Sequence, residues 1–319
     1  MSVDEAQRAL TAAAQSPHDL GLCVRAVRLL DAADCRADAH TVARQYARRH
    51  DARDDGGDAL LAAVLRAETV ELASGEALLR EGVDESDDVF VLLHGDARVR
   101  RLGVGELTQV PPGSILGEVA PLTGTARTAS VYAKGPVVAL RFRSAALAEL
   151  SRRLPGIYAR LRETGRSRMV AQLFGPDSIF GGLSGHERAA LFEQCVPVTV
   201  PEGHAVIRGG EPGHAVCIIA SGMAEVWRGD GRGERAVITT LGPGSVFGEL
   251  ALLFDRKANA TVEASTTLTL FCLDAKRFHD ALARFPEARV RVLRLAEQRL
   301  GVGLMDAGGA LPVATVMRE

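Results

Sequence analysis

The strongest constraint on the fold is an internal repeat. Residues 116–131 read LGEVAPLTGTARTASV and residues 247–262 read FGELALLFDRKANATV, so the two stretches begin 131 positions apart. Further upstream the spacing changes slightly, because Gly95 and Gly222 are 127 positions apart. Insertions that fall in turns, between segments that keep their register, are typical of a structural repeat. The sequence therefore predicts two copies of one folded unit.

Each copy contains short apolar stretches that are broken by Gly, Pro and Asp and followed by residues with helical periodicity. Such stretches favour strands of a sandwich or barrel-like roll, and GDGRG at 229–233 is typical of a hairpin turn. We expect an α+β fold class with two tandem jelly-roll-like β-rolls and flanking helices. The expected strands include Val89–Leu93, Val137–Phe142, Cys217–Ala220, Ala236–Leu241 and Leu268–Leu273, and the expected helices are Ala145–Leu154, Ile157–Leu173, Ala275–Phe285 and Pro286–Leu300.

The first 65 residues differ from the repeats because their periodicity is helical throughout. Helices are expected at Val3–Ala14, Leu20–Ala32 and Ala37–Arg49, followed by a linker at Asp51–Asp58. The second and third helices resemble one degenerate tetratricopeptide-type hairpin. We favour the alternative, a helical prefix packed on the first roll, because such repeats usually need several copies to bury a core.

The predicted division of the chain has four parts. Residues 1–65 form the helical segment and residues 66–173 form the first roll. Residues 174–300 form the second roll, and residues 301–319 form a short tail.

Composition excludes several classes of function. The formal net charge is −2 and the pI is about 6.5, so neither a nucleic-acid surface nor a polybasic membrane anchor is expected. No apolar run approaches the length of a membrane span. The five cysteines and eight histidines show no metal-ligand spacing. We therefore expect no DNA, membrane or metal partner, and buried reduced thiols in a cytoplasmic protein.

The repeated stretch has the residue types needed to hold a phosphorylated sugar. In the first copy, Gly117 permits close approach to the backbone, and the free N–H groups of a following short helix suit a phosphate. Arg127 adds a bidentate, charge-assisted contact to phosphate oxygens, and Glu118 accepts hydrogen bonds from sugar hydroxyls. Phosphate and ribose on one stretch indicate a nucleotide. No Walker lysine or carboxylate cluster is present, which argues against triphosphate chemistry.

Further residues around the repeated stretch match the sequence pattern of a known family. Pro-Gly-Ser precedes each copy at 112–114 and 243–245, and residues 179–184 read IFGGLS before the second roll. With Gly95 and Gly222, these features resemble the cyclic nucleotide-binding domains of cAMP-dependent kinase regulatory subunits, cyclic-nucleotide-gated channels and the catabolite activator family. The resemblance covers residues 66–300 as two tandem domains, and the repeated stretch corresponds to the family's phosphate-binding cassette.

The resemblance implies a ligand, cAMP or cGMP, and no further cofactor. Thr128 follows Arg127 as in cGMP-dependent kinases, where the hydroxyl helps to hold guanine, although Thr is also common on half-buried strands. Tyr158 is a candidate to cap the base, and packing is an equally good account of it. The implied ligand-binding residues are Gly117, Glu118, Val119, Ala120, Arg127 and Thr128 in the first domain, and Gly248, Glu249, Leu250, Ala251 and Lys257 in the second.

The sequence departs from the family pattern at two places. Pro121 replaces the usual apolar residue that couples cassette to helix, and Leu122 is expected to take over that role. In the second copy Ala258 stands where the first has Arg127. Arg256 or Lys257 is a possible substitute, and strand alternation allows only one of them to point inward. We therefore expect the second site to be degenerate.

The leading hypothesis is a non-catalytic, cytoplasmic cyclic nucleotide sensor that signals through altered contacts with an unidentified protein effector. After Leu300 only 19 residues remain, too few for a helix-turn-helix, which again argues against DNA. A homodimer is possible, because helices after such rolls often mediate dimers in this family. The alternative is a scaffold that uses the rolls as interaction surfaces, with Glu118, Arg127 and Glu249 in intramolecular ion pairs only.

Overall fold

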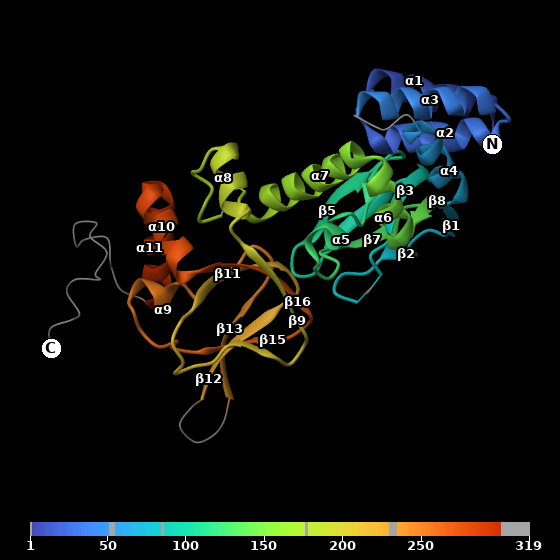
Figure 1. Cartoon of the computed structure of the whole chain (residues 1–319). Helices are drawn as coiled ribbons and strands as arrows, with labels where there is room; N and C mark the ends of the chain where they lie inside the picture. The colour runs from blue at the N-terminus through green and yellow to red at the C-terminus, as the bar shows by residue number, and fades with distance from the viewer. Residues whose placement is uncertain (1, 51–54, 84–85, 176–177, 230–234, 301–319) are drawn as a thin grey trace, which may run out of the picture. The chain divides into compact units, whose positions relative to one another are not determined.

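The computed structural model describes residues 2–50, 55–83, 86–175, 178–229 and 235–300 (Figure 1). The chain forms two compact units. The first extends to Gly165, apart from two short turns at 81–83 and 102–104, and the second begins at Arg166. Within the described residues no helix has the length and apolar character that a membrane crossing requires.

Four helices begin the chain: α1 (Val3–Gln15), α2 (Leu20–Ala32), α3 (Arg36–Arg49) and α4 (Gly56–Arg66). The first three match the predicted helices to within two residues. The fourth was not predicted. It begins at Gly56, inside the linker expected at Asp51–Asp58, so that expectation is wrong at its end. Residues 51–54 of the expected linker lie outside the described part. The Gly56-Gly57 pair suggests a loop, but Gly57 serves a close helix contact, since a Cβ there would lie 2.5 Å from Arg44 Cγ.

These helices pack on the first roll. A Cβ at Gly21 of α2 would lie 1.8 Å from the carbonyl oxygen of Gly113, so the helix touches the roll backbone. Arg25 Nε donates to the carbonyl of Leu93 at 2.8 Å. The buried residues of α2 share one hydrophobic core with Val91 and Leu93 of the strand at 89–94. The sequence boundary at residue 65 remains a prediction, because this core continues across it.

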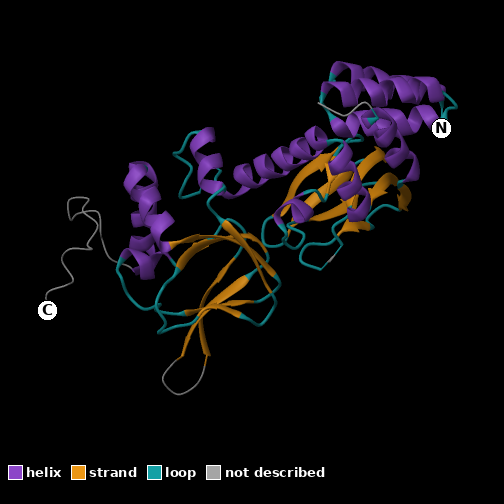
Figure 2. Cartoon of the chain, viewed as in Figure 1, coloured by secondary structure: helices purple, strands orange, loops and turns teal. Residues whose placement is uncertain are grey.

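The first roll consists of two four-stranded antiparallel sheets (Figure 2). One has the order β1-β8-β3-β6 and the other β2-β7-β4-β5. The apolar side chains between them include Leu79, Leu92 and Leu116. The elements are β1 (Glu68–Leu72), β2 (Ala77–Leu79), β3 (Val89–His94), β4 (Ala97–Arg101), β5 (Gly105–Val110), β6 (Ile115–Leu116), α5 (Val119–Thr123), β7 (Ser130–Ala133), β8 (Val137–Phe142), α6 (Ser144–Arg153) and α7 (Pro155–Leu173).

The second roll repeats this topology. Its sheets have the orders β9-β16-β11-β14 and β10-β15-β12-β13, the same as in the first roll with each strand replaced by its counterpart. The predicted fold class is confirmed. Residues 230–233 of the predicted hairpin turn lie outside the described part, and Gly229 pairs with Arg235 across it. The elements are α8 (Gly185–Phe192), β9 (Val196–Val200), β10 (Ala205–Ile207), β11 (Ala215–Ser221), β12 (Ala224–Gly229), β13 (Arg235–Leu241), β14 (Val246–Phe247), α9 (Glu249–Leu253), β15 (Thr261–Ala264), β16 (Leu268–Asp274), α10 (Ala275–Arg284) and α11 (Pro286–Leu300).

The expectation that all five cysteines are reduced thiols is wrong for one pair of them. Cys217 on β11 and Cys272 on β16 face each other in the strand register and form a disulfide. They are 55 residues apart in sequence, so no short-range cysteine spacing indicates the bond. Cys23, Cys35 and Cys195 are free. The described residues contain no group of three or more His, Cys, Asp or Glu side chains arranged to hold a metal ion.

Candidate nucleotide-binding site

The first cassette is a sharp turn between β6 and α5. Gly117 has a φ of 82°, which favours glycine, and Glu118 then enters the helical region. A Cβ at Gly117 would lie 2.8 Å from Nη1 of Arg127 and 3.0 Å from the carbonyl oxygen of Asp88. Glycine is therefore required here for two reasons, backbone conformation and the close approach of the arginine.

Arg127 is the central cation of this cassette, and it is only 2% exposed. Its Nη1 donates to the carbonyl of Gly117 at 2.6 Å. Its Nη2 donates to the carbonyl of Asp88 at 2.8 Å and also to the carbonyl of Ser86. The guanidinium thus joins the cassette to the segment before β3 through neutral acceptor oxygens. Phosphate oxygens present the same acceptor chemistry with added charge, which makes a stronger hydrogen bond.

Asp88 connects this arginine to a second one. Its carboxylate, in a residue only 5% exposed, accepts from Nε of Arg141 at 2.6 Å. Arg141 on β8 also lies 3.8 Å from Glu68 on β1. Asp88 therefore accepts from Arg127 through its backbone carbonyl and from Arg141 through its carboxylate. The sequence did not indicate this arrangement, because the three residues come from distant parts of the chain.

Helix α7 lies directly against the first cassette. A Cβ at Gly165 would lie 3.0 Å from Leu122 Cδ1 and 3.7 Å from Cγ of Glu118. Leu122 therefore packs against α7. A contact between cassette and helix is what the sequence predicted for Leu122, in place of Pro121. Glu118 is 2% exposed, in keeping with a carboxylate held inside the roll.

The other predicted residues of the first site belong to the same cassette, with Val119 and Ala120 in α5 and Thr128 shortly before β7. Ala120 and Thr128 are buried, and Val119 is half-buried. The carbonyl of Thr128 accepts from Nε of Arg101 at 3.2 Å. Tyr158, the candidate base cap, is instead grouped with Leu20 and Val24 of α2 around a small hollow.

The second cassette keeps the turn and changes the charges. Gly248 has a φ of 91°, and a Cβ there would lie 2.4 Å from the carbonyl oxygen of Ala215. Glu249 is 1% exposed and forms an ion pair with Nη1 of Arg299 at 2.7 Å. Nη2 of Arg299 donates to the carbonyl of Val246 at 2.7 Å. Helix α11, the last helix of the described part, therefore neutralises the buried carboxylate of this cassette.

A cavity of about 390 Å³ opens beside the second cassette. Gly248, Glu249, Leu250 and Ala251 line it, so four of the five predicted residues meet at one place. Lys257 is exposed, and it is not among the described residues that line the cavity. The guanidinium of Arg256 lies over the ring of Phe254, 5.7 Å from its centroid. Neither predicted substitute for Arg127 faces the cavity.

Three arginines that the sequence did not single out line this cavity: Arg208, Arg228 and Arg299. Arg228 on β12 donates through Nε to the carbonyl of Asn259 at 2.8 Å, the same contact that Arg101 makes with Thr128. Each of these two strand arginines follows its hairpin glycine, Gly95 or Gly222, by six positions. That shared spacing was the available signal for the pair.

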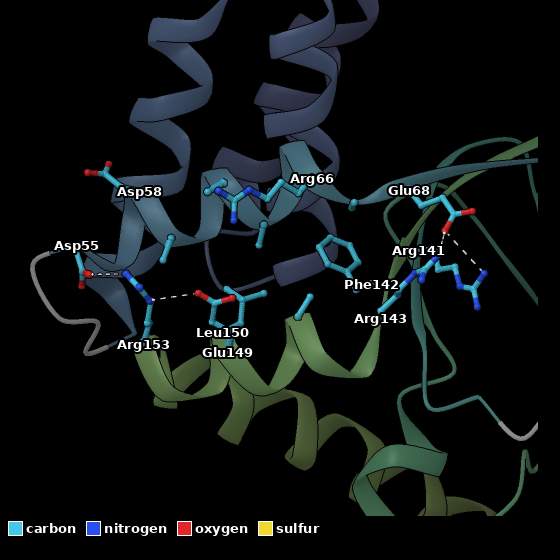
Figure 3. Close-up of a pocket in the computed structure, with 15 residues that line it drawn as sticks. Asp55, Asp58, Arg66, Glu68, Arg141, Phe142, Arg143, Glu149, Leu150 and Arg153 are labelled. Atoms are coloured by element: carbon cyan, nitrogen blue, oxygen red, sulfur yellow. Dashed lines mark hydrogen bonds and ion pairs between the residues drawn. The ribbon is translucent and has the colours of Figure 1, made fainter.

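A larger cavity of about 560 Å³ lies away from both cassettes, between α4 and α6 (Figure 3). Several of its charged side chains form ion pairs with each other. At one end Arg153 contacts Asp55 at 3.0 Å, and at the other Arg143 contacts Glu68 at 3.1 Å. Its walls contain no cassette residue, so volume alone does not identify the nucleotide site.

The two rolls and their repeated cassettes define a tandem β-roll protein with two candidate nucleotide sites. The family model described as "Cyclic nucleotide-binding domain" matches residues 69–153 and 197–285. The chain belongs to the cyclic nucleotide-binding domain family.

Individual relatives agree with this assignment. The chain is 32% identical over 209 residues to a cAMP-dependent protein kinase regulatory subunit of Yarrowia lipolytica, a match that covers 66% of this chain and 52% of that protein. It is 32% identical over 122 residues to a CRP-like cAMP-activated global transcriptional regulator of Mycobacterium tuberculosis, covering 38% of this chain and 54% of that protein. The chain thus spans about half the length of these curated relatives.

Among solved structures, the regulatory subunit of a cAMP-independent protein kinase A from Trypanosoma brucei is 21% identical, with a TM-score of 0.38. That comparison covers 76% of this chain and 84% of the other.

Proposed function

We propose that this chain is a non-catalytic sensor that binds a cyclic nucleotide in its first roll. The observation that carries the proposal is the buried guanidinium of Arg127, held beside the turn of Gly117 by backbone carbonyls. An arginine with such acceptors keeps its donors oriented toward the cassette, and a cyclic phosphate would exchange neutral acceptors for a charged one. Glu118, buried on the same turn, supplies the acceptor for a ribose hydroxyl.

The site is connected to a structural element that can carry the signal. Leu122 and Glu118 lie against α7 at Gly165, so a movement of the cassette on binding must be accommodated by that helix. A ligand shifts such an equilibrium only by its differential affinity for the two positions of the helix. We propose that the changed surface of α6 and α7 is read by a protein effector, in the cytoplasm, with cAMP as the first ligand to test and cGMP as the second.

The scaffold remains the second candidate because of one observation. The hydrogen bonds of Arg127 to Gly117, Ser86 and Asp88 stabilise the roll without any ligand. A protein that had lost signalling would retain these bonds for structure alone. Under this reading neither nucleotide binds, and a homodimer or another assembly would be the output.

Calorimetric titration of the purified chain with cAMP, cGMP and AMP separates the two candidates. The sensor predicts binding of a cyclic nucleotide at micromolar or lower Kd and weaker binding of AMP, which has no cyclic phosphate. Hydrogen exchange in residues 144–173 should change when the ligand is added. Failure of both cyclic nucleotides to bind would overturn the sensor and leave the scaffold.

A further inference from the structure

We propose that Arg228 replaces the missing cassette arginine in the second roll, so that the second cavity takes a phosphate-bearing ligand of nucleotide size. The positive group would then come from strand β12 and not from the cassette. The inference concerns the second roll alone and does not depend on binding at Arg127. It also differs from the sequence expectation, which considered only Arg256 and Lys257 as substitutes.

The position of Arg228 carries the first step. Its Nε is bonded to the carbonyl of Asn259, which directly follows Ala258, the position equivalent to Arg127. Arg228, Ala258 and Asn259 all line the 390 Å³ cavity. The guanidinium therefore lies at the end of the cavity where the cassette cation is missing. An arginine has five N–H donors, and the Nε bond to Asn259 fixes the plane of the group while using one of them.

The first roll shows that this strand position is next to the cassette in both domains. Arg101 makes the equivalent bond to Thr128 at 3.2 Å, and Arg101 is 9% exposed. In the first roll, however, Arg127 is also present. The second roll has kept the strand arginine and lost the cassette arginine, so Arg228 still supplies a cation at this end of its cavity.

The described lining of the cavity carries three arginines, Arg208, Arg228 and Arg299, against two carboxylates, Glu211 and Glu249, so its net charge is positive and favours an anion. Glu211 belongs to the same end of the cavity, since its backbone carbonyl accepts from the N–H of Ala258 at 2.8 Å. Arg299 is paired with Glu249 on the cassette, so these two charges offset each other. Arg208 comes directly after β10 and also lines the cavity, on the other side of β15 from β12. Two arginines thus flank the start of β15. Both side chains are exposed, so their attraction for an anion is weaker than that of a buried arginine and is screened by salt.

The rest of the cavity suits an apolar body. Its walls include Ile207, Val226, Leu241, Phe247 and Val262, all from the strands of the roll. A pocket with apolar walls and a few convergent polar groups is the usual form of a small-molecule site. A nucleotide places a planar base against such walls and its phosphate at the cationic end.

The single tryptophan of the chain makes the test specific for this roll. Trp227 precedes Arg228 on β12, and its indole N–H donates to Glu263 at 3.1 Å. We would titrate the Arg127→Ala protein with cAMP and with adenosine, following tryptophan fluorescence and, in parallel, calorimetry. The expected result is weak but saturable binding of cAMP in the second roll, which declines as KCl is raised.

Substitution then identifies the cation. Arg228→Gln in the Arg127→Ala background should weaken cAMP binding about tenfold or more and leave adenosine binding nearly unchanged, because adenosine has no phosphate. Adding Ala258→Arg to that protein should restore cAMP affinity by returning the cation to the cassette. Arg256→Gln is the matched control, an exposed arginine close by, and it should have no effect.

Two outcomes would overturn the proposal. One is the absence of cAMP binding to the second roll of the Arg127→Ala protein by both readouts. The other is equal cAMP affinity with and without Arg228, or a loss that Arg256→Gln reproduces. Neither outcome bears on the first roll, whose binding is measured separately in the Arg228→Gln protein with Arg127 intact.

Discussion

Nη2 of Arg127 donates to the backbone carbonyl of Asp88 at 2.8 Å, while the carboxylate of the same Asp88 accepts from Arg141. The segment before β3 is thus fixed between the cassette and β8. A ligand that recruits Arg127 must compete with the first of these bonds, and the second bond determines how firmly Asp88 stays in place.

The first prediction concerns this carboxylate. Asp88→Ala removes the partner of a half-buried arginine from a position that is 5% exposed, and we expect a loss of about 1–3 kcal/mol in the free energy of unfolding. Urea denaturation measures it. Glu68→Gln, which removes the exposed carboxylate 3.8 Å from the same Arg141, should cost less than about 1 kcal/mol. Equal losses in the two variants would show that Asp88 has no special role.

The second prediction compares two glycines with left-handed backbone. Gly117 has a φ of 82° and a Cβ there would meet Arg127, whereas Gly124 has a φ of 66° and open space around it. Gly124→Ala therefore carries only the conformational cost, about 1 kcal/mol. Gly117→Ala adds the displacement of Arg127 and should be the more destabilising by roughly 1–3 kcal/mol. Thermal unfolding of the two variants checks the order, and a reversed order contradicts the described turn.

The third prediction concerns the buried charge of the second cassette. Arg299→Ala leaves Glu249, 1% exposed, without its ion-pair partner. We expect a loss of roughly 2–3 kcal/mol, below the usual cost for a fully buried pair because Arg299 itself is partly exposed. The double variant Arg299→Ala with Glu249→Gln should recover part of it, since the uncompensated charge is then gone. Chemical denaturation provides both values.

The fourth prediction concerns the cysteines. Iodoacetamide under denaturing conditions without reductant should alkylate three cysteines, namely Cys23, Cys35 and Cys195, and all five only after reduction. Mass spectrometry counts them directly. Five modified cysteines without reductant would show that Cys217 and Cys272 are not bonded in the isolated protein.

Two of these thiols also make stability depend on pH. Burial raises the pKa of Cys23 to about 12 from 9.0, and it raises the pKa of Cys195 likewise to about 12. The unfolded chain therefore ionises first, so stability should fall as the pH rises from about 9 toward 12. Cys195→Ala should flatten this slope, and an unchanged slope would count against the burial described here.

Much of the fold follows from local sequence, and the exceptions have identifiable causes. Helices α1, α2 and α3 and the strands at 89–94 and 137–142 follow from hydrophobic periodicity. Helix α4 was missed because Gly57 indicates a turn, whereas its lack of a side chain serves contact with Arg44. The Cys217–Cys272 bond was missed because strand register, not spacing, brings the two together.

The site was predictable to a similar degree. Gly117, Glu118 and Arg127 are found together because the cassette is contiguous in sequence. Arg228 and Arg299 reach the second cassette from a strand and a helix, and Arg141 on β8 contacts Asp88, whose backbone carbonyl accepts from Arg127. These roles depend on tertiary packing that a single sequence does not show.

The most direct test of the account is the cAMP dissociation constant of the Arg127→Ala protein, measured by calorimetry against the unsubstituted chain. Loss of a buried, charge-assisted phosphate contact should weaken binding at the first site by roughly 100-fold. Arg152→Ala, at an exposed position on α6, is the control and should leave the affinity unchanged. Tight cAMP binding that survives without Arg127 would contradict a nucleotide site built on this cassette.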